Sequence, residues 1–278
     1  MRTTILITGA NGFLAGAVAN AIPRDWRLVG LVRESSIPSV ANRRYDGYFE
    51  SVDALFDAES QVAVVLHLAA RIPRSMNHPD PHLALVNVSL PAQLLARYPW
   101  ARHVMASSTS VYGRPTMLPI SIDTPAAPCT PYGWSKLSAE CLVRTASDYA
   151  ILRLSSIIGC GMRSGSFIPT MVAAARDGRM RLLGDGSRTQ DYIDVRDAAA
   201  MCVHAALATK DNFVALAVSG RAPTNLQVAE ELARLTGAGI EFSGEDASPS
   251  FAYTLDRSPA LQSSRISLHD TLIEMLSQ

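Results

Sequence analysis

The sequence predicts an α/β protein, a doubly wound parallel sheet with a smaller C-terminal α/β lobe. Three observations support this prediction: several apolar runs are continuous rather than alternating, helical segments lie between them, and a glycine-rich turn follows the first run. Continuous apolar strands are typical of parallel sheets covered on both faces. Regular alternation of strands and helices is the pattern that builds such sheets.

The predicted elements alternate along the chain. Strands are expected at residues 4–8, 27–32, 62–68, 103–107, 150–154 and 214–218. Helices are expected at residues 13–22, 53–56, 83–97, 132–147, 167–176, 198–208, 226–235 and 268–276, with Asp197 as the N-cap of the helix at 198–208. Turn-rich stretches lie at 159–165 and 184–187. We therefore assign residues 1–158 and about 189–219 to a larger domain, and residues 159–188 and 220–278 to a smaller lobe.

The composition is that of a folded protein with a formal net charge of zero. It has 278 residues, of which 48% are hydrophobic and 18% charged, and 25 basic residues balance 25 acidic ones. We therefore expect a small-molecule substrate and neither a nucleic-acid nor a membrane partner. The four cysteines form no Cys-x-x-Cys pair, which argues against a disulfide framework and structural zinc. The apolar run at the N-terminus is too short for a signal peptide, so we expect a cytoplasmic protein. We also expect no metal site.

A Gly-x-x-Gly turn lies where the first predicted strand gives way to the first helix. Free amides and the dipole at a helix N-terminus bind a pyrophosphate, and glycine lets the backbone approach it. The turn therefore predicts a Rossmann-type dinucleotide site, and an ordinary strand-to-helix turn is the alternative. The residues assigned to the site here are Gly9, Asn11, Gly12, Phe13 and Leu14.

Arg33 follows the second predicted strand, where a dinucleotide fold places the residue that contacts the adenosine ribose. An acidic residue there binds a free 2′-hydroxyl, whereas a cation suits a 2′-phosphate. We therefore expect NADP(H) in preference to NAD(H). In the alternative interpretation Arg33 is simply solvated.

A serine, a tyrosine and a lysine form the sharpest candidate for chemistry. Ser108 ends a predicted strand, while Tyr132 and Lys136 open a predicted helix. Residues four apart lie on one helical face, so the Lys136 ammonium would favour the phenolate form of Tyr132. A tyrosine tuned in this way can exchange a proton with a substrate hydroxyl or carbonyl. Alone, a Tyr-x-x-x-Lys spacing is more often an amphipathic surface helix.

Five further segments are informative: residues 8–14 (TGANGFL), 67–70 (HLAA), 87–88 (NV), 108–113 (STSVYG) and 191–197 (DYIDVRD). With them the chain resembles, over nearly its whole length, the extended short-chain dehydrogenases/reductases of the NAD-dependent epimerase/dehydratase type. The resemblance implies that Tyr132 is the catalytic acid/base, that Lys136 holds the nicotinamide ribose and tunes Tyr132, and that Ser108 orients the reacting oxygen. It also implies a homodimer packed through the helices at 83–97 and 132–147. Further cofactor contacts are implied for Asp46, Gly47, Leu68, Ala69, Ala70 and Asn87.

Departures from the family pattern narrow the expected reaction. Thr109 and Ser110 stand where dehydratases of the family carry an Asp-Glu pair, so no carboxylate base is available for elimination. Gln190 replaces an arginine usual in nucleotide-sugar members, and Ser156 replaces an asparagine. Arginine is well suited to bind a diphosphate, so either the substrate is not a nucleotide sugar or other residues have taken over. The candidates for that role are Arg163, Arg181 and Arg188.

Three functional hypotheses remain. The leading one is a reductase that transfers hydride from NADPH to a ketone of a sugar or sugar-like substrate. The second is an NAD-dependent nucleotide-sugar 4-epimerase, which the Ser108, Tyr132 and Lys136 set also permits. The third is a cofactor-binding sensor or scaffold without catalysis, which would not need Tyr132 or Lys136.

Overall fold

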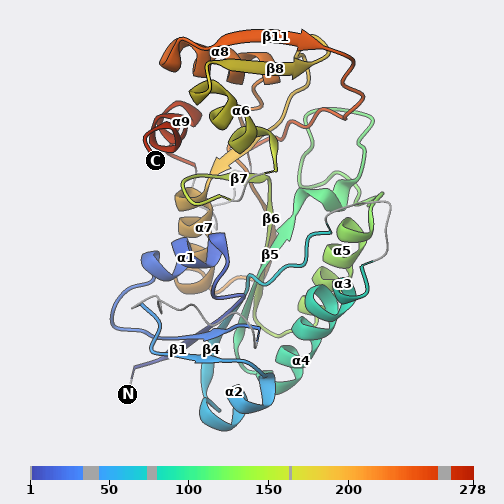
Figure 1. Ribbon diagram of the computed structural model, residues 1–278. Helices are drawn as coiled ribbons and strands as arrows, with labels where there is room; N and C mark the ends of the chain where they lie inside the picture. Colours follow the sequence, from blue (N-terminus) through green and yellow to red (C-terminus); the bar gives the residue numbers. More distant parts are fainter. Residues whose placement is uncertain (1, 34–43, 74–79, 163–164, 256–263) are drawn as a thin grey trace.

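The computed structural model describes residues 2–33, 44–73, 80–162, 165–255 and 264–278. Its centre is a seven-stranded parallel sheet with the strand order β10-β6-β5-β4-β1-β2-β3 (Figure 1). These strands are β1 (Thr4–Thr8), β2 (Arg27–Leu31), β3 (Gly47–Phe49), β4 (Val62–His67), β5 (Arg102–Ser108), β6 (Tyr149–Leu154) and β10 (Phe213–Ala217). The order reverses between β1 and β4, so the carboxyl ends of these two strands open a crevice where α/β proteins bind ligands. The predicted doubly wound sheet is confirmed.

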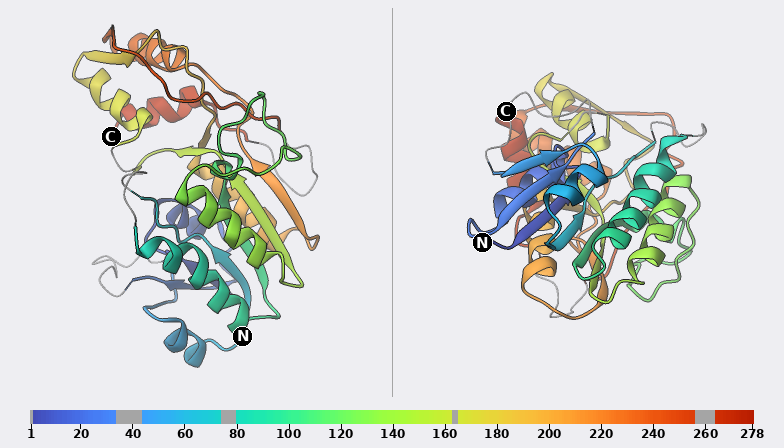
Figure 2. Two further views of the ribbon diagram at one scale, coloured as in Figure 1. Left: turned by 90° about the vertical axis from the view of Figure 1, so that its right-hand side faces the viewer. Right: turned by 90° about the horizontal axis from the view of Figure 1, so that it is seen from below.

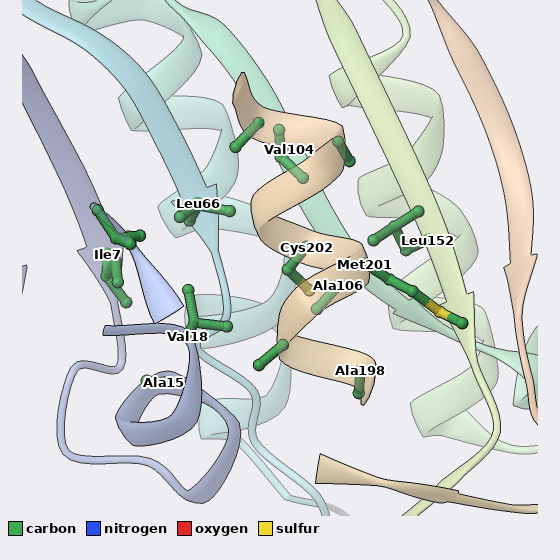
Figure 3. Close-up of a cluster of buried hydrophobic side chains, with 14 of the residues drawn as sticks. Ile7, Ala15, Val18, Leu66, Val104, Ala106, Leu152, Ala198, Met201 and Cys202 are labelled. Carbon is green, nitrogen blue, oxygen red and sulfur yellow. The ribbon is translucent and has the colours of Figure 1, made fainter. Parts of the chain in front are cut away.

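Helices cover both faces of the sheet (Figures 1 and 2). On one face lie α1 (Phe13–Ala21) and α7 (Val195–Leu207), and Figure 3 shows their small side chains packed against Ile7, Leu66 and Leu152 of the sheet. On the other face lie α2 (Val52–Ala58), α4 (Leu90–Arg97) and α5 (Pro131–Val143). The strands are apolar throughout because both of their faces are buried in this way.

One predicted helix, at residues 83–97, is interrupted by a π-helical turn. It consists of α3 (His82–Ala84), η2 (Leu85–Ser89) and α4. Pro91 has no N–H to donate to the carbonyl of Asn87, and its ring would clash with that carbonyl in a regular α-helix. The wider turn relieves this clash, and it places the Asn87 side chain in the interior.

The smaller lobe has a hydrophobic core of its own. It contains α6 (Phe167–Arg176), β8 (Arg179–Leu183), α8 (Asn225–Thr236), β11 (Gly239–Ser243) and α9 (Leu268–Leu276), seen at the top of Figure 1. Met171, Leu182, Leu232 and Leu272 meet in its core. Two further strands, β7 (Ser156–Ile158) and β9 (Tyr192–Asp194), form a separate two-stranded parallel sheet. In the chain β7 follows β6, and β9 precedes α7. None of the strands β3, β7, β8, β9 and β11 was predicted, because β3, β7 and β9 have only three residues and β8 and β11 lack the continuous apolar run of the predicted strands.

The predicted cap of α7 was wrong. The helix begins at Val195, and Asp194 is its N-cap, with a side chain that accepts a hydrogen bond from the amide of Arg196. Asp197 lies in the first turn instead. Its carboxylate accepts hydrogen bonds from the Ser264 hydroxyl at 2.8 Å and from the amides of Arg265 and Ile266. It therefore fixes the segment that leads into α9.

Candidate active site

A cavity of about 550 Å³ lies between the carboxyl ends of the sheet strands and the smaller lobe. One wall comes from the loops that follow β1 and β4, with Phe13, Leu14, Leu68 and Ala70. The floor carries Ser108, Tyr132 and Lys136. The structure therefore brings the predicted catalytic set and part of the predicted cofactor set into one space.

Tyr132 and Lys136 reach the cavity from the first two turns of α5. Thr130 caps this helix, since its hydroxyl accepts from the amide of Gly133 at 3.1 Å, and Pro131 occupies the first turn, where its missing N–H costs nothing. Lys136 is almost fully buried, and its Nζ donates a hydrogen bond to the carbonyl of Ala106 at 2.8 Å. The Nζ atom lies 5.9 Å from the centre of the Tyr132 ring.

Burial has the largest effect on the pKa values of both Tyr132 and Lys136. It raises the pKa of Tyr132 to about 12, while a hydrogen bond with Ser108 acts in the opposite direction. It also lowers the pKa of Lys136 to about 8, against the carboxylate of Glu140, which raises it. In the protein itself Tyr132 is therefore a neutral phenol at pH 7, because desolvation outweighs the hydrogen bond with Ser108.

Two neighbouring serines at the end of β5 point to different partners. Ser108 lines the cavity and accepts a hydrogen bond from the amide of Ser110 at 3.1 Å, which caps the 3-10 helix η3 (Thr109–Tyr112). Ser107 is buried, and its hydroxyl donates to Glu140 at 2.5 Å. Successive strand residues alternate between faces, so Ser108 is available to a ligand and Ser107 fastens α5 to the sheet.

The glycine-rich turn is built for close approach of two loops. Gly9 has a φ of +66°, and a Cβ atom there would lie 2.8 Å from the Cα of Ala69. Thr8 holds the same two loops together, because its hydroxyl accepts from the amides of Leu68 at 3.1 Å and Ala69 at 3.0 Å. Gly12 is the N-cap of α1 and supplies no side-chain hydrogen bond to the first amides of the helix. Sequence analysis missed Thr8 as a site residue, although it ends the first strand with a hydroxyl.

The side chain of Asn87 connects α5 to the loop that follows β4. Its Oδ1 accepts from the amide of Arg71 at 2.7 Å, and its Nδ2 donates to the carbonyl of Arg71 and to the Ser135 hydroxyl. The Ser135 hydroxyl in turn donates to the carbonyl of Tyr132 at 2.7 Å. Asn87 therefore contributes by positioning the loop and the helix, and Ser135 is a further residue that sequence analysis missed.

Two predicted cofactor residues lie away from the cavity. Asp46 precedes β3, and its carboxylate binds the amide of Leu28 at 2.8 Å and the Arg2 guanidinium at 2.6 Å. Gly47 pairs with Val29 in the middle of β2. Both residues therefore lie toward the amino ends of the parallel strands, whereas the cofactor loops leave from the carboxyl ends.

Among the remaining predicted cofactor residues, Arg33 is exposed directly after β2, at the carboxyl edge of the sheet. Asn11 is exposed in the glycine-rich turn. Both are therefore on the ligand-binding edge, although neither lines the cavity.

The lobe side of the cavity carries a short hydrogen-bonded chain. Arg188 donates to the Gln190 side-chain oxygen at 3.2 Å and to the carbonyl of Pro249 at 3.1 Å, and Gln190 donates to the Ser156 hydroxyl at 3.0 Å. Tyr192 lies beside them, with a buried hydroxyl. These residues, together with Met162 and Phe167, face Tyr132 across the cavity. Gln190 and Tyr192 were not predicted as site residues.

The other two predicted substrate arginines are not part of this wall. Arg181 lies on the exposed face of β8 in the outer sheet, away from the cavity lining. Arg163 lies outside the described residues. Arg188 is therefore the guanidinium that the described part of the chain brings to the cavity.

Two negative findings concern the described ranges alone. Within them, no three His, Cys, Asp or Glu side chains are grouped so as to hold a metal ion. In the same ranges, no helix has the length and apolar character needed to cross a membrane.

Comparisons with known proteins agree with this geometry. The model of the NAD dependent epimerase/dehydratase family matches residues 5–215. A UDP-glucose 4-epimerase of Mycolicibacterium smegmatis is 32% identical over 231 residues, which cover 74% of this chain and 73% of that protein. The UDP-glucuronic acid 4-epimerase of Bacillus cereus, solved in complex with UDP-glucuronic acid and NAD, is 25% identical. The match covers 99% of this chain and 98% of the Bacillus cereus chain, with a TM-score of 0.82. The chain is an enzyme of the NAD-dependent epimerase/dehydratase family.

Proposed function

We propose that the protein is an NAD-dependent 4-epimerase of a nucleotide sugar, with a UDP-linked sugar as the expected substrate. The observation that carries the proposal is the single cavity in which Ser108, Tyr132 and Lys136 lie between a dinucleotide-type turn and the smaller lobe. The relatives named above are UDP-sugar 4-epimerases, and they favour this hypothesis over the reductase that the sequence put first.

The residues around the glycine-rich turn fit a dinucleotide. The close approach of Gly9 to Ala69 leaves no room for a side chain, the amides at the start of α1 have no side-chain cap, and Phe13 and Leu14 of this helix line the cavity. These amides would hold the pyrophosphate, and Lys136 and Tyr132 would contact the nicotinamide ribose. When bound, the cofactor supplies a carbon that takes up a hydride from the sugar and returns it.

In this proposal, side chains of the protein transfer the proton of the sugar hydroxyl. Once its own proton has been lost to solvent, Tyr132 would accept the proton of the sugar hydroxyl at its Oη atom as the sugar is oxidised, and it would return that proton when the sugar is reduced on its other face. Ser108, which is hydrogen-bonded to Tyr132, orients the reacting oxygen. The ammonium of Lys136, which lies 5.9 Å from the ring centre, would favour the phenolate form of Tyr132, in opposition to the effect of burial.

The lobe wall supplies the substrate contacts in this proposal. Arg188 is fixed by Gln190 and by the carbonyl of Pro249, so its guanidinium is available for a phosphate without a large loss of side-chain entropy. Ser156 offers a hydroxyl group to the sugar.

NAD is the cofactor in this proposal. The expected preference for NADP is not supported by the comparisons, since the Bacillus cereus structure contains NAD. Arg33 remains the one argument for NADP, and a cofactor assay decides between the two.

The test needs one preparation. The purified protein is denatured and any released nicotinamide nucleotide is identified by mass, and the native protein is incubated with UDP-glucose, UDP-galactose, UDP-glucuronic acid and UDP-galacturonic acid without added cofactor. We expect released NAD and interconversion of at least one pair. Protein that is free of nucleotide, prefers NADPH and reduces ketones instead would overturn the proposal in favour of the reductase.

A further inference from the structure

A buried carboxylate lies one helical turn beyond Lys136 on α5. Glu140 has no exposed surface, and both of its oxygens are used. Its Oε1 accepts from Ser107 at 2.5 Å, and its Oε2 accepts from the Nη2 atom of Arg153 on β6 at 2.8 Å. The geometry is that of an ion pair closed off from water, with side-chain exposures of 1% for Glu140 and 7% for Arg153.

Stability alone does not account for this pair. Removing two charges from water costs several kcal/mol per ion, and apolar side chains of similar volume often hold a helix on a sheet equally well. Arg153 also needs a hydrogen bond to Tyr112 at 2.8 Å and contact with its ring to satisfy its donors. A buried pair with so many supports, placed directly beneath the candidate site, suggests a contribution to the site itself.

The surroundings of Lys136 identify that contribution. On α5 the charged or titratable groups near it are Tyr132 and Glu140, and β5 offers the carbonyl of Ala106. From β4 His67 faces it, but burial holds the pKa of His67 well below its usual range, so it carries no charge at neutral pH. Among the described residues, Glu140 is the anion that acts on Lys136.

The composition adds an independent argument. The 25 basic residues comprise two lysines, Lys136 and Lys210, and 23 arginines. Arginine stays protonated under all conditions that proteins meet, whereas a buried lysine readily loses its proton. Among the described residues four cationic side chains are buried: the guanidinium groups of Arg44, Arg102 and Arg153 keep their protons, and Lys136 is the one whose charge can be lost.

We propose that Glu140 is a positioning residue that keeps Lys136 protonated and that couples it, through Ser107 and Arg153, to the strands beneath the site. A charged Lys136 donates to Ala106 and favours the phenolate of Tyr132, so the pair extends the pH range in which the site is competent. The catalytic consequence rests on the proposed function, but the charge state of Lys136 does not.

The two lysines make the charge state directly measurable. Protein labelled with ¹³C-lysine gives two Cε signals, and exposed Lys210 serves as the internal reference. Three variants are compared with the wild type: Glu140→Gln, the double variant Glu140→Gln/Arg153→Met, and Asp194→Asn as a control. Asp194 is the buried half of another ion pair, with Arg196, and lies outside the cavity lining. The double variant leaves no unpaired buried charge, so it protects the test against a folding failure of Glu140→Gln.

We expect the pKa of Lys136 to fall by about one unit or more in Glu140→Gln, because an opposite charge nearby is lost while the Arg153 cation remains, and to fall less in the double variant, in which that cation is lost as well. Asp194→Asn should leave it unchanged. The alkaline limb of the kcat/KM profile should move to lower pH by the same amount in the Glu140 variants. A Lys136 that titrates at the wild-type pH in folded Glu140→Gln, or in the folded double variant where the single variant does not fold, overturns the proposal, whether or not the enzyme proves to be an epimerase.

Discussion

Lys136 lies 5.9 Å from the centre of the Tyr132 ring, yet its ammonium donates its hydrogen bond to the carbonyl of Ala106. The lysine is therefore close to the tyrosine ring, while its hydrogen bond goes to the backbone of β5. The group that is hydrogen-bonded to Tyr132 is Ser108. This division assigns orientation to the serine and charge to the lysine.

Replacement of Tyr132 tests the proton-transfer role. Tyr132→Phe removes only the hydroxyl, so we expect kcat to fall by about 10²- to 10⁴-fold, the usual contribution of a general acid or base. The retained nucleotide should still be found after denaturation, because the ring remains in place. Tyr149→Phe, at the amino end of β6 on the opposite edge of the sheet, is the matched control and should keep its activity. Near-normal turnover in Tyr132→Phe would show that another group moves the proton.

Replacement of Lys136 should separate stability from activity. The folded protein holds Lys136 at a pKa of about 8, compared with 10.5 ordinarily, so the unfolded chain binds more protons between these pH values. The unfavourable burial of the charge is fully present below pH 8 and disappears as the pH rises toward 10.5. It amounts to about 3 kcal/mol.

Lys136→Met should therefore raise the free energy of unfolding at pH 7 by up to about 3 kcal/mol, less the value of the lost bond to Ala106. The same variant should lose turnover. Chemical denaturation at pH 7 and pH 9.5 measures both states, and the advantage of the variant should shrink at the higher pH. A variant that is less stable than the wild type at pH 7 would contradict the assigned cost of burial.

Asn87 should control retention of the cofactor more than the chemistry. Asn87→Ala removes the bonds that hold Arg71 and Ser135, so the loop after β4 is no longer fixed to α5. We expect NAD to dissociate more easily, with a rise in its dissociation constant of about tenfold or more, since a buried polar network is broken. Turnover at saturating NAD should change less.

The chain offers a close control for that variant. Asn212 makes similar side-chain bonds to the backbone of Ser147 and Tyr149, but at the amino edge of the sheet. Asn212→Ala should therefore lower stability without changing NAD binding. Equal NAD affinity in the wild type and Asn87→Ala would remove Asn87 from the cofactor site altogether.

The sequence was sufficient to predict the central strands because their apolar runs are continuous, and β1 and α6 have the predicted limits. The candidate site was predictable wherever neighbouring residues carry it, as in Tyr132 and Lys136. Glu140 could not be identified as a site residue, because its role depends on Arg153 from another strand and on Ser107. Asp46 and Gly47 were assigned from the family resemblance alone, and the structure places both outside the cavity lining.

Association of two copies through α4 and α5 is the last prediction. The two helices lie side by side on one face of the sheet (Figure 2), and Leu85 in η2 and Trp134 in α5 are 59% and 57% exposed. Large exposed apolar side chains on neighbouring helices favour burial against a second copy. We expect light scattering to give the mass of a dimer, and Leu85→Glu or Trp134→Glu to shift it toward the monomer, because each variant would bury an unpaired charge. Leu183→Glu, at a comparably exposed position on β8 in the smaller lobe, should leave the mass unchanged. A wild-type protein that is monomeric at every concentration would contradict the prediction, and loss of the dimer in Leu183→Glu alone would move the interface to the lobe.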